Sequence, residues 1–395
     1  MIIRSDRIYT SDGCINGVLE IENGMIKEIR KGSSEEVDHD FTGNIIYPGL
    51  IDTHNHGNYG YALRNTNQSM EERMELVECY LKNLASFGIT GVFPTCSYDN
   101  VSCVESVTHK KIRGSKILGI HVEGPWLARA GEKGTAAAYP QPTKEMAEQM
   151  VRDGKGMLKL VALSPEVKNI ENITDVMHEN HVALSMAHTS FSFQQATDAI
   201  NNFHFVTATH VGNGMSGIHH RDVGALGAAL LNQDIYCEII CDFIHLCKEM
   251  VEIIFKVKSH DKLMLISDNS EFTRLPKGRY KLDGGYIDSD GVNTLITNTG
   301  KIQGSNRTIL NGLQNIVKEI GISLEEAWKM TSYNVCTHYG IEKRGKLEQG
   351  YYADFVVMNQ NLEIEKTFLE GIEIYDSKKD QPKINELFVE ENMIK

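Results

Sequence analysis

The sequence has no apolar run long enough to cross a membrane, and its start lacks the apolar segment of a secretory signal. Its 8 cysteines are scattered and form no Cys-x-x-Cys pair. These absences favour a cytoplasmic protein whose cysteines are buried thiols rather than disulfides. Positive charge is also scarce, since the formal net charge is −13. This balance argues against non-specific binding to nucleic acid or to a membrane surface, although a small anionic substrate can still bind in a locally basic pocket.

The chain of 395 residues is longer than one typical core requires, so we expect one large domain and a smaller one. Short alternating segments with turns occupy the N-terminus, and the same character returns in GKLEQGYYADFVVMNQ and FLEGIEIYD. We therefore predict a small β-sandwich built from residues 1–46 and 346–395, with residues 47–345 forming the large domain. Two unrelated edge hairpins are the alternative interpretation of these ends.

Eight short apolar runs lie between the two ends, and amphipathic segments such as MEERMELVECYLKNLASFG and KEMAEQMVRDG separate many of them. The runs are IIYPGLIDTH, TGVFPTC, KILGIHVEG, LKLVALSPE, VALSMAH, FVTATH, IYCEIICD and LMLISD. Repeated strand–helix units of this kind indicate a parallel sheet covered by helices. Eight units predict an α/β fold of the closed (β/α)8 TIM-barrel type, and a doubly wound open sheet is the competing architecture.

Five of the eight runs finish with a residue suited to metal binding or acid–base chemistry. They end at His54-Asn55-His56, Glu123, His188, His210 and Asp268. In a barrel the carboxyl ends of all strands open onto one face, so these side chains can converge. This pattern favours the barrel, because an open sheet would spread the same residues along its edge.

His54 and His56 are two residues apart in an extended segment and therefore point to the same side. A hydrogen-bonded histidine pair would explain this motif alone, but Glu123, His188 and His210 in matching positions favour a metal site. Imidazole and carboxylate ligands without thiolate suit Zn²⁺ or Fe²⁺, bound as one or two ions.

Asp268 ends the last apolar run, in LMLISDNS. A carboxylate at this place could cap a helix. Beside a metal it could instead act as a general base that takes a proton from water and delivers it to a leaving nitrogen. Metal binding would lower the pKa of that water to roughly 7.

The segment ATHVGNGMSGIHHRD offers polar groups next to the predicted ligand His210. Asn213-Gly214 is a flexible bend whose N–H groups could meet a substrate oxygen. Arg221 suits a phosphate, although a surface ion pair with Asp222 is the simpler alternative. His245 follows the seventh run and could donate to a sugar hydroxyl or a phosphate, or could be a satisfied core residue.

Taken in order, these motifs resemble the N-acetylglucosamine-6-phosphate deacetylases of the amidohydrolase superfamily. The likeness rests on PGLIDTHNHG, GIHVEGPW followed by KGT, SPE, MAHTS, ATHVGNGM with IHHRD, Asp242-x-x-His245, LISD, LPKGRYKLDG and IQGS, and on the closing SLEEAWKMTSYNVCTHYGI with RGKLEQGYYADFVVM. It spans nearly the whole chain.

The resemblance implies hydrolysis of the acetamido group of an N-acetylhexosamine 6-phosphate to acetate and the free amine, by a barrel with a β-sandwich. It implies that Glu123, His188 and His210 hold the principal divalent metal, Zn or Fe, and that His54 and His56 hold a second one. Asp268 would be the acid–base catalyst. The implied substrate contacts are Thr135, Ala136, Asn213, Gly214, Arg221, His245, Ile302, Gln303 and Gly304. The resemblance also implies a homodimer in which the matching arginine reaches the neighbouring active site.

Three positions depart from the family pattern on the substrate side. Ala136 stands where the family has a histidine, and alanine cannot donate a hydrogen bond. Phe243 replaces a glycine in the D-G-x-H motif, and Asn269 replaces a small alanine after the catalytic aspartate. The metal ligands and the base are intact, so these departures concern the substrate rather than hydrolysis, and a different acetamido sugar phosphate or another N-acyl amine is the alternative substrate.

Two other functions compete with this interpretation. A cyclic amidase of the same superfamily would carry a bridging lysine at the end of the fourth strand, but here that strand ends in SPE and Lys159 lies near its start. A metal-binding or sugar-phosphate-sensing protein without activity would explain the three departures. Such a protein would have no need of Asp268.

Overall fold

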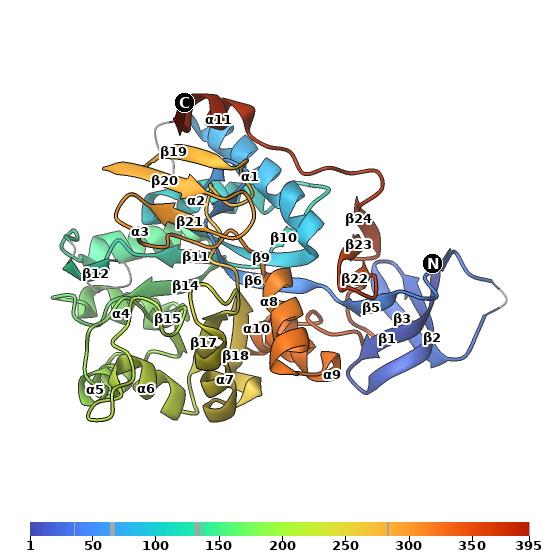
Figure 1. Cartoon of the computed structure of the whole chain (residues 1–395), viewed down its shortest axis with the longest axis horizontal. Coiled ribbons are helices and arrows are strands. Elements are labelled where there is room, and N and C mark those ends of the chain that lie inside the picture. Colours follow the sequence, from blue (N-terminus) through green and yellow to red (C-terminus); the bar gives the residue numbers. More distant parts are fainter. Residues whose placement is uncertain (35, 64–67, 131–134, 137, 283, 395) are drawn as a thin grey trace.

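The computed structural model describes residues 1–34, 36–63, 68–130, 135–136, 138–282 and 284–394. Its centre is a barrel of eight parallel strands in the order in which they occur along the chain (Figure 1). The barrel strands are β6 (Leu50–Asn55), β9 (Ile89–Cys96), β11 (Ile120–Glu123), β14 (Leu158–Leu163), β15 (Ala183–Met186), β16 (Thr207–Ala208), β17 (Tyr236–Ile240) and β18 (Leu263–Ile266). The predicted α/β barrel is confirmed, and the open doubly wound sheet is excluded.

The barrel closes where its first and last strands meet. The N–H of Asp268 donates to the carbonyl of His54 at 2.9 Å, and the N–H of His56 donates to the carbonyl of Asn269 at 2.7 Å. The short strand β10 (Lys116–Ile117) adds to the outer side of β9. Closure brings the ends of β6 and β18 together, although more than 200 residues separate them in the chain.

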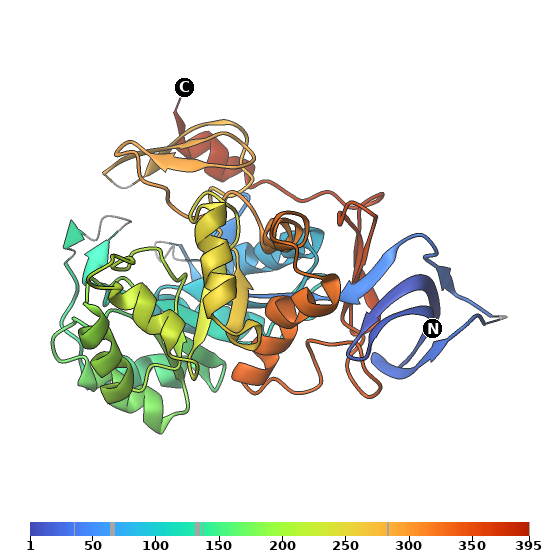
Figure 2. The same ribbon diagram turned by 60° about the horizontal axis from the view of Figure 1, so that its bottom comes forward.

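Helices cover the outside of the barrel and pack on it through apolar side chains (Figures 1 and 2). They are α1 (Met70–Leu84), α2 (Val101–Val107), α3 (Lys144–Gly154), α4 (Glu171–Glu179), α5 (Phe193–Asn202), α6 (Gly224–Leu231), α7 (Lys248–Val257), α8 (Ile309–Asn315), α9 (Leu324–Trp328) and α10 (Asn334–His338). Local sequence fixes the start of α1, because Ser69 caps this helix in a capping box with Glu72. Such a cap contributes about 1 kcal/mol to stability.

The two ends of the chain meet in one eight-stranded sheet beside the barrel, seen at the right of Figure 1. Its strands are β1 (Ile2–Thr10), β2 (Gly13–Glu22), β3 (Met25–Lys31), β4 (His39–Asp40), β5 (Ile45–Pro48), β22 (Phe355–Met358), β23 (Ile364–Leu369) and β24 (Ile372–Asp376). β22 pairs with β5, which joins the N-terminal and C-terminal parts. Unrelated edge hairpins are therefore excluded, whereas the exact division at residues 46 and 346 stays a prediction.

The run IIYPGLIDTH, predicted as one strand, is two. β5 belongs to the terminal sheet and β6 to the barrel, with Gly49 between them. A Cβ at Gly49 would lie 2.3 Å from the side chain of Thr90, so only glycine fits at this crossing point.

A small sheet stands over one side of the barrel mouth, in gold and orange at the top of Figure 2. It contains β19 (Gly278–Leu282), β20 (Gly285–Ser289), β21 (Leu295–Thr297) and the last strand of the chain, β25 (Met393–Ile394). The helix α11 (Glu386–Asn392) precedes β25, and Phe388 packs against the apolar core of this sheet. Two short hairpins, β7 (Gly57–Asn58) with β8 (Tyr61–Ala62) and β12 (Arg129–Ala130) with β13 (Thr135–Ala136), complete the strands.

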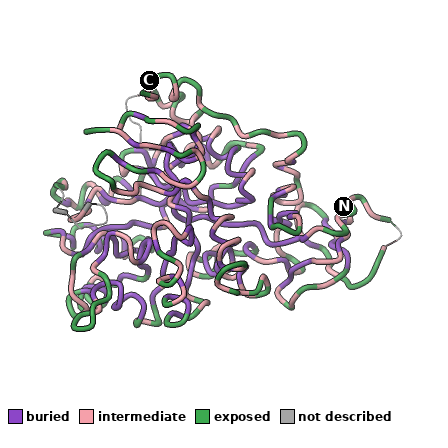
Figure 3. The backbone as a smooth tube through the Cα atoms, in the orientation of Figure 1, coloured by how far each residue is buried: buried purple, intermediate pink, exposed green. Residues whose placement is uncertain are grey.

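Burial follows this architecture: the barrel strands are buried along their length, whereas loops and the outer edges of the sheets are exposed (Figure 3). The eight cysteines are free thiols, as the sequence predicted; five of them are buried, but Cys14 and Cys247 are exposed and Cys79 is half-buried, so the prediction of burial holds only in part. In the described part of the chain, no helix combines the length and the apolar character that a membrane span needs.

Candidate metal centre

Six side chains predicted from five distant segments converge at the carboxyl ends of the barrel strands. Two groups of three lie within metal-binding reach: His54, His56 and Asp268 form one group, and Glu123, His188 and His210 form the other. In each group the potential ligand atoms all lie within 4.8 Å of one another. Glu123, His188 and His210 are therefore close enough to one another to share a single cation.

Glu123 lies between the two groups and uses a different oxygen for each. Its Oε1 is 3.3 Å from Nε2 of His188 and 3.1 Å from Nε2 of His210. Its Oε2 is 3.2 Å from Nε2 of His56 and 3.6 Å from Nε2 of His54. A carboxylate in this position can bridge two cations.

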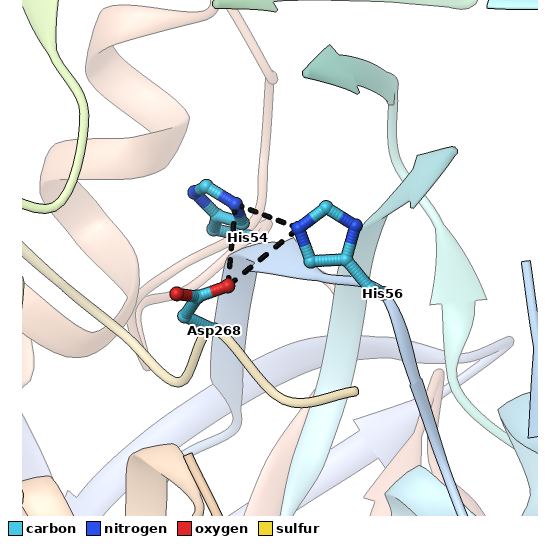
Figure 4. Close-up of side chains that lie close together, drawn as sticks. All are labelled: His54, His56 and Asp268. Carbon is cyan, nitrogen blue, oxygen red and sulfur yellow. Dashed lines mark hydrogen bonds and ion pairs between the residues drawn. The ribbon is translucent and has the colours of Figure 1, made fainter. Parts of the chain in front are cut away.

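The second group is equally compact (Figure 4). Nε2 of His54 lies 3.1 Å from Nε2 of His56, and each nitrogen is 3.5 Å from Oδ1 of Asp268. The two imidazoles point to the same side, as their i, i+2 spacing on an extended segment predicts, and the structure shows that each turns Nε2 toward the other.

The chemistry of these donors fits divalent cations. Four imidazole nitrogens and two carboxylates meet in a largely buried space where water cannot screen their lone pairs. A cation shared among them relieves this repulsion, and nitrogen and carboxylate donors without thiolate suit Zn²⁺ or Fe²⁺. His188 and His210 would hold one ion, His54 and His56 a second, and Glu123 would touch both.

The backbone has an unusual conformation at three of these residues. His188, His210 and Asp268 have φ values of +49°, +31° and +52°, in the left-handed region that L-residues rarely adopt. Each stands two residues beyond the end of its strand, β15, β16 or β18. Such a conformation costs roughly 1–3 kcal/mol per residue and persists where the surrounding structure enforces it, typically at functional sites.

The charges of the cluster residues stabilise the ionised forms of both His54 and Glu123. Burial disfavours the charged form of His54, but the carboxylates of Glu123 and Asp268 outweigh it and raise the pKa of His54 well above its usual value. Burial likewise acts to raise the pKa of Glu123, but His54, followed by hydrogen bonds from His188 and His210, lowers it well below the usual range. The Glu123 carboxylate is therefore kept ionised, as a metal ligand must be.

A second layer of buried side chains lies behind the cluster. Glu238, on β17 and fully buried, accepts a hydrogen bond from the hydroxyl of Thr53 at 2.7 Å and lies 3.4 Å from Nδ1 of His54. It thereby fixes the orientation that turns Nε2 of His54 toward Glu123. Nδ1 of the buried His121 lies 3.0 Å from the carbonyl of Thr53, and burial lowers the pKa of His121 to about 3, so that its ring is neutral.

Glu238 and His121 were not among the predicted site residues. A glutamate inside the apolar run IYCEIICD and a histidine two residues before Glu123 were the available signals. Burying a carboxylate is costly unless it has partners, so an acidic residue within a barrel strand already indicates a polar cluster.

The amidohydrolase family model matches residues 45–387, which cover the barrel and every residue of the cluster. The chain belongs to the amidohydrolase family.

Individual members of the family resemble this chain over most of its length. The N-acetylglucosamine-6-phosphate deacetylase of Vibrio furnissii is 28% identical over 345 residues, covering 84% of this chain and 83% of that protein. The N-acetylgalactosamine-6-phosphate deacetylase of Escherichia coli O157:H7 is 24% identical and covers 94% and 98%. The crystal structure of the N-acetylglucosamine-6-phosphate deacetylase of Thermotoga maritima superposes with a TM-score of 0.78 at 26% identity, covering 95% of this chain and all of that chain.

Several predicted substrate contacts of this amidohydrolase lie beside the cluster. Asn213 hydrogen-bonds back to the carbonyl of His210, and Gly214 lies directly against the ring of His188, where a Cβ would approach Nδ1 to 2.8 Å. Ile302 and Gln303 extend the edge of β21, and Gly304 turns beside the carbonyl of Asp268. A side chain larger than glycine at 214 or 304 would press on a residue of the cluster.

The Asp242-x-x-His245 motif forms a local unit at the end of β17. Nδ1 of His245 lies 2.7 Å from Oδ2 of Asp242, and Oδ1 of Asp242 accepts the N–H groups of Ile244 and His245. Phe243, which replaces the family glycine, has a φ of +59° and therefore adopts a conformation that suits glycine better. The backbone at Phe243 is therefore strained.

Other predicted residues have different surroundings. Arg221 lies on an exposed loop, and among the described residues its side chain has no hydrogen bond or ion pair to the cluster. The suggested pair with Asp222 is absent, because that carboxylate accepts the N–H groups of Phe193 and Gly224. Thr135 and Ala136 form β13, but their side chains lie outside the described part of the structure.

Asn269, the third departure, is buried behind the cluster. Its amide nitrogen donates to the carbonyls of Ser305 and Arg307, both at 2.8 Å, and its oxygen lies 3.4 Å from the amide nitrogen of Asn55. Asn269 thus ties the end of β18 to the segment after Gly304, a connection that alanine could not make.

Proposed function

We propose that this amidohydrolase is a metal-dependent deacetylase that removes the acetyl group of an N-acetylhexosamine 6-phosphate, most simply N-acetylglucosamine 6-phosphate. The observation that carries the proposal is the convergence of Glu123, His188 and His210 with Asp268 at one end of the barrel. Relatives named as deacetylases of glucosamine and galactosamine phosphates support the substrate class, while they leave the sugar epimer open.

Different residues of the chain would have different roles in the proposed reaction. Glu123, His188 and His210 would hold a divalent cation, Zn or Fe, which when bound would supply Lewis acidity for the activation of water and the polarisation of the amide carbonyl. Asp268 takes the proton of the attacking water and returns it to the amide nitrogen as the carbon–nitrogen bond breaks. Acetate and the amino sugar phosphate leave. His54 and His56 would hold a second ion that shares Glu123.

The surroundings of the cluster would position the sugar phosphate. Asn213 and Gly214 lie next to the principal metal group, and the edge formed by Ile302, Gln303 and Gly304 lies next to Asp268. His245 would meet a sugar hydroxyl or the phosphate. Thr135 and Ala136 remain predicted contacts of the acetamido end.

We also propose a homodimer in which the exposed Arg221 of each protomer serves the neighbouring site. Mixing an Arg221→Ala variant with an Asp268→Asn variant would then restore activity through hybrid dimers. A cytoplasmic location stays a prediction.

Acetate release tests the proposed reaction directly. The purified enzyme, supplied separately with Zn²⁺ and Fe²⁺, is incubated with N-acetylglucosamine 6-phosphate, N-acetylgalactosamine 6-phosphate and their unphosphorylated forms. We expect release from at least one phosphorylated sugar. Hydrolysis of cyclic amides alone would favour the cyclic-amidase function, and no release from any N-acyl sugar would favour a non-catalytic binder.

A further inference from the structure

Arg307 is a half-buried cation that the sequence analysis did not single out. Its Nε and Nη2 donate to the side-chain oxygen of Asn293 at 3.1 Å and 2.8 Å, and its Nη1 donates to the backbone carbonyl of Asp242 at 3.4 Å. Asn293 stands in the turn between β20 and β21, so the guanidinium lies between the small upper sheet and the end of β17.

The charge of Arg307 is not matched by a carboxylate. Both of its acceptors are neutral, and among the described residues it forms no ion pair. The nearby carboxylate of Asp242 is already occupied by four donors, the N–H groups of Ile244 and His245, Nδ1 of His245 and the hydroxyl of Ser305. An unpaired guanidinium is unusual in a protein whose net charge is −13.

Hydrogen bonds connect Arg307 to both sides of the proposed active site. Its N–H donates to the hydroxyl of Ser305 at 3.0 Å, and that hydroxyl donates to Asp242, the partner of His245. The N–H of Ser305 donates to the carbonyl of Asp268 at 2.9 Å. Arg307 and His245 are therefore held on one scaffold, which also holds the backbone of Asp268.

A second guanidinium strengthens the positive field at this edge. The half-buried Arg274 donates to the side-chain oxygen of Asn311 at 3.1 Å and forms no ion pair within the described ranges. Burial lowers the pKa of Arg274, and the charge of Arg307 lowers it further. Two arginines that repel each other are stabilised when an anion binds beside them.

We propose that Arg307 reads the anionic group of the substrate from within the same protomer, as a specificity-determining residue for phosphorylated sugars. This inference rests on the proposed function, and it differs from the assignment of the phosphate to Arg221 alone. Arg221 is exposed and would act across a subunit boundary, whereas Arg307 donates to the backbone carbonyl of Asp242, the partner of His245, in its own chain. Its planar fork of donors suits a phosphate, since Nη1 is bound only by a long hydrogen bond.

Binding of the reaction product tests this role without depending on turnover. Calorimetric titration compares glucosamine 6-phosphate with glucosamine on the metal-loaded wild type and on Arg307→Gln, Arg307→Lys and Asn293→Ala. We expect Arg307→Gln to weaken glucosamine 6-phosphate about tenfold or more, the scale of one charge-assisted hydrogen bond, with glucosamine unchanged. Arg307→Lys should recover part of the loss.

Asn293→Ala is the matched control, because it removes the contact to β20–β21 while keeping the cation. If Arg307 were only a structural link, Asn293→Ala would reproduce the loss, or Arg307→Gln would weaken both ligands equally; either result overturns the proposal. A wild type that binds both ligands equally well overturns it too. Arg307→Gln could weaken glucosamine 6-phosphate selectively while the wild type hydrolyses no N-acetyl sugar phosphate. That result would support the role of Arg307 and refute the proposed reaction.

Discussion

At the scale of single residues, the positions just beyond the strands concentrate the chemistry. His188, His210 and Asp268 each adopt a left-handed backbone two residues after a strand ends. Such a conformation persists where the surrounding structure enforces it, and here the closed barrel does so for three of the six ligand candidates.

Asp268→Asn tests whether Asp268 is the base or a ligand. An amide retains the shape of the side chain but cannot accept a proton, so kcat should fall by a factor of about 10² or more while bound metal is unchanged. Elemental analysis and acetate-release kinetics on the same sample check both parts. Loss of metal in this variant would mean that Asp268 coordinates an ion, as its 3.5 Å distance from His54 and His56 also permits.

Glu238→Gln tests the layer behind the metal centre. Because Glu238 orients His54 through Nδ1, its loss should weaken metal binding at the His54–His56 position by roughly 10- to 100-fold and leave the Glu123–His188–His210 position intact. Metal titration of the apoprotein then gives one strong equivalent instead of two. Thr53→Val, which removes the other hydrogen bond of Glu238, is a milder control. Two unaltered equivalents in Glu238→Gln would rule out this positioning role.

At the scale of elements, the C-terminal segment links parts that are distant in the sequence. After β24 the chain runs past α1, where the N–H of Lys383 donates to the side chain of Asn83, and past the β7–β8 hairpin, where Asn385 donates to Tyr59 and Gly60. It ends as β25 beside β19. The segment therefore supports both the hairpin that follows His56 and the upper sheet that carries Asn293.

The start of this segment contains an ion-pair network that should make stability depend on pH. Lys366 and Lys379 donate to Asp376 at 2.6 Å and 2.9 Å, and hydrogen bonds from these lysines hold the pKa of Asp376 far below its ordinary value. Since the folded pKa is depressed, the stabilisation is complete above the unfolded pKa of about 4 and is lost as the pH falls below it.

Asp376→Asn should accordingly lower the free energy of unfolding by about 1–3 kcal/mol at pH 7, and the difference should narrow steadily from pH 4 to pH 2.5. Denaturant titrations at each pH give the comparison, with the exposed Asp12→Asn as a control. A difference that stays constant over this range would contradict the assigned cause.

At the scale of the whole molecule, metal binding and folding should be coupled, because the proposed ligands come from segments spread between residues 54 and 268. An ion that binds only the folded chain stabilises it in proportion to the logarithm of its concentration. Chelation should therefore lower Tm by roughly 3–6 °C, and added Zn²⁺ or Fe²⁺ should restore it. In His188→Ala, chelation should have a smaller effect. An unchanged Tm after proven metal removal would argue against this coupling.

The sequence by itself determined the barrel, the meeting of the two ends and the ligand candidates, because alternating apolar runs and helices leave few arrangements and parallel strands share one open face. Only the tertiary structure decided which oxygen of Glu123 faces which histidine pair, that Glu238 stands behind His54, and that Arg307 donates to the carbonyl of Asp242. These relations join residues far apart in the chain. They depend on the exact turn after each strand and on the side-chain orientation that it sets, which a local sequence pattern does not encode.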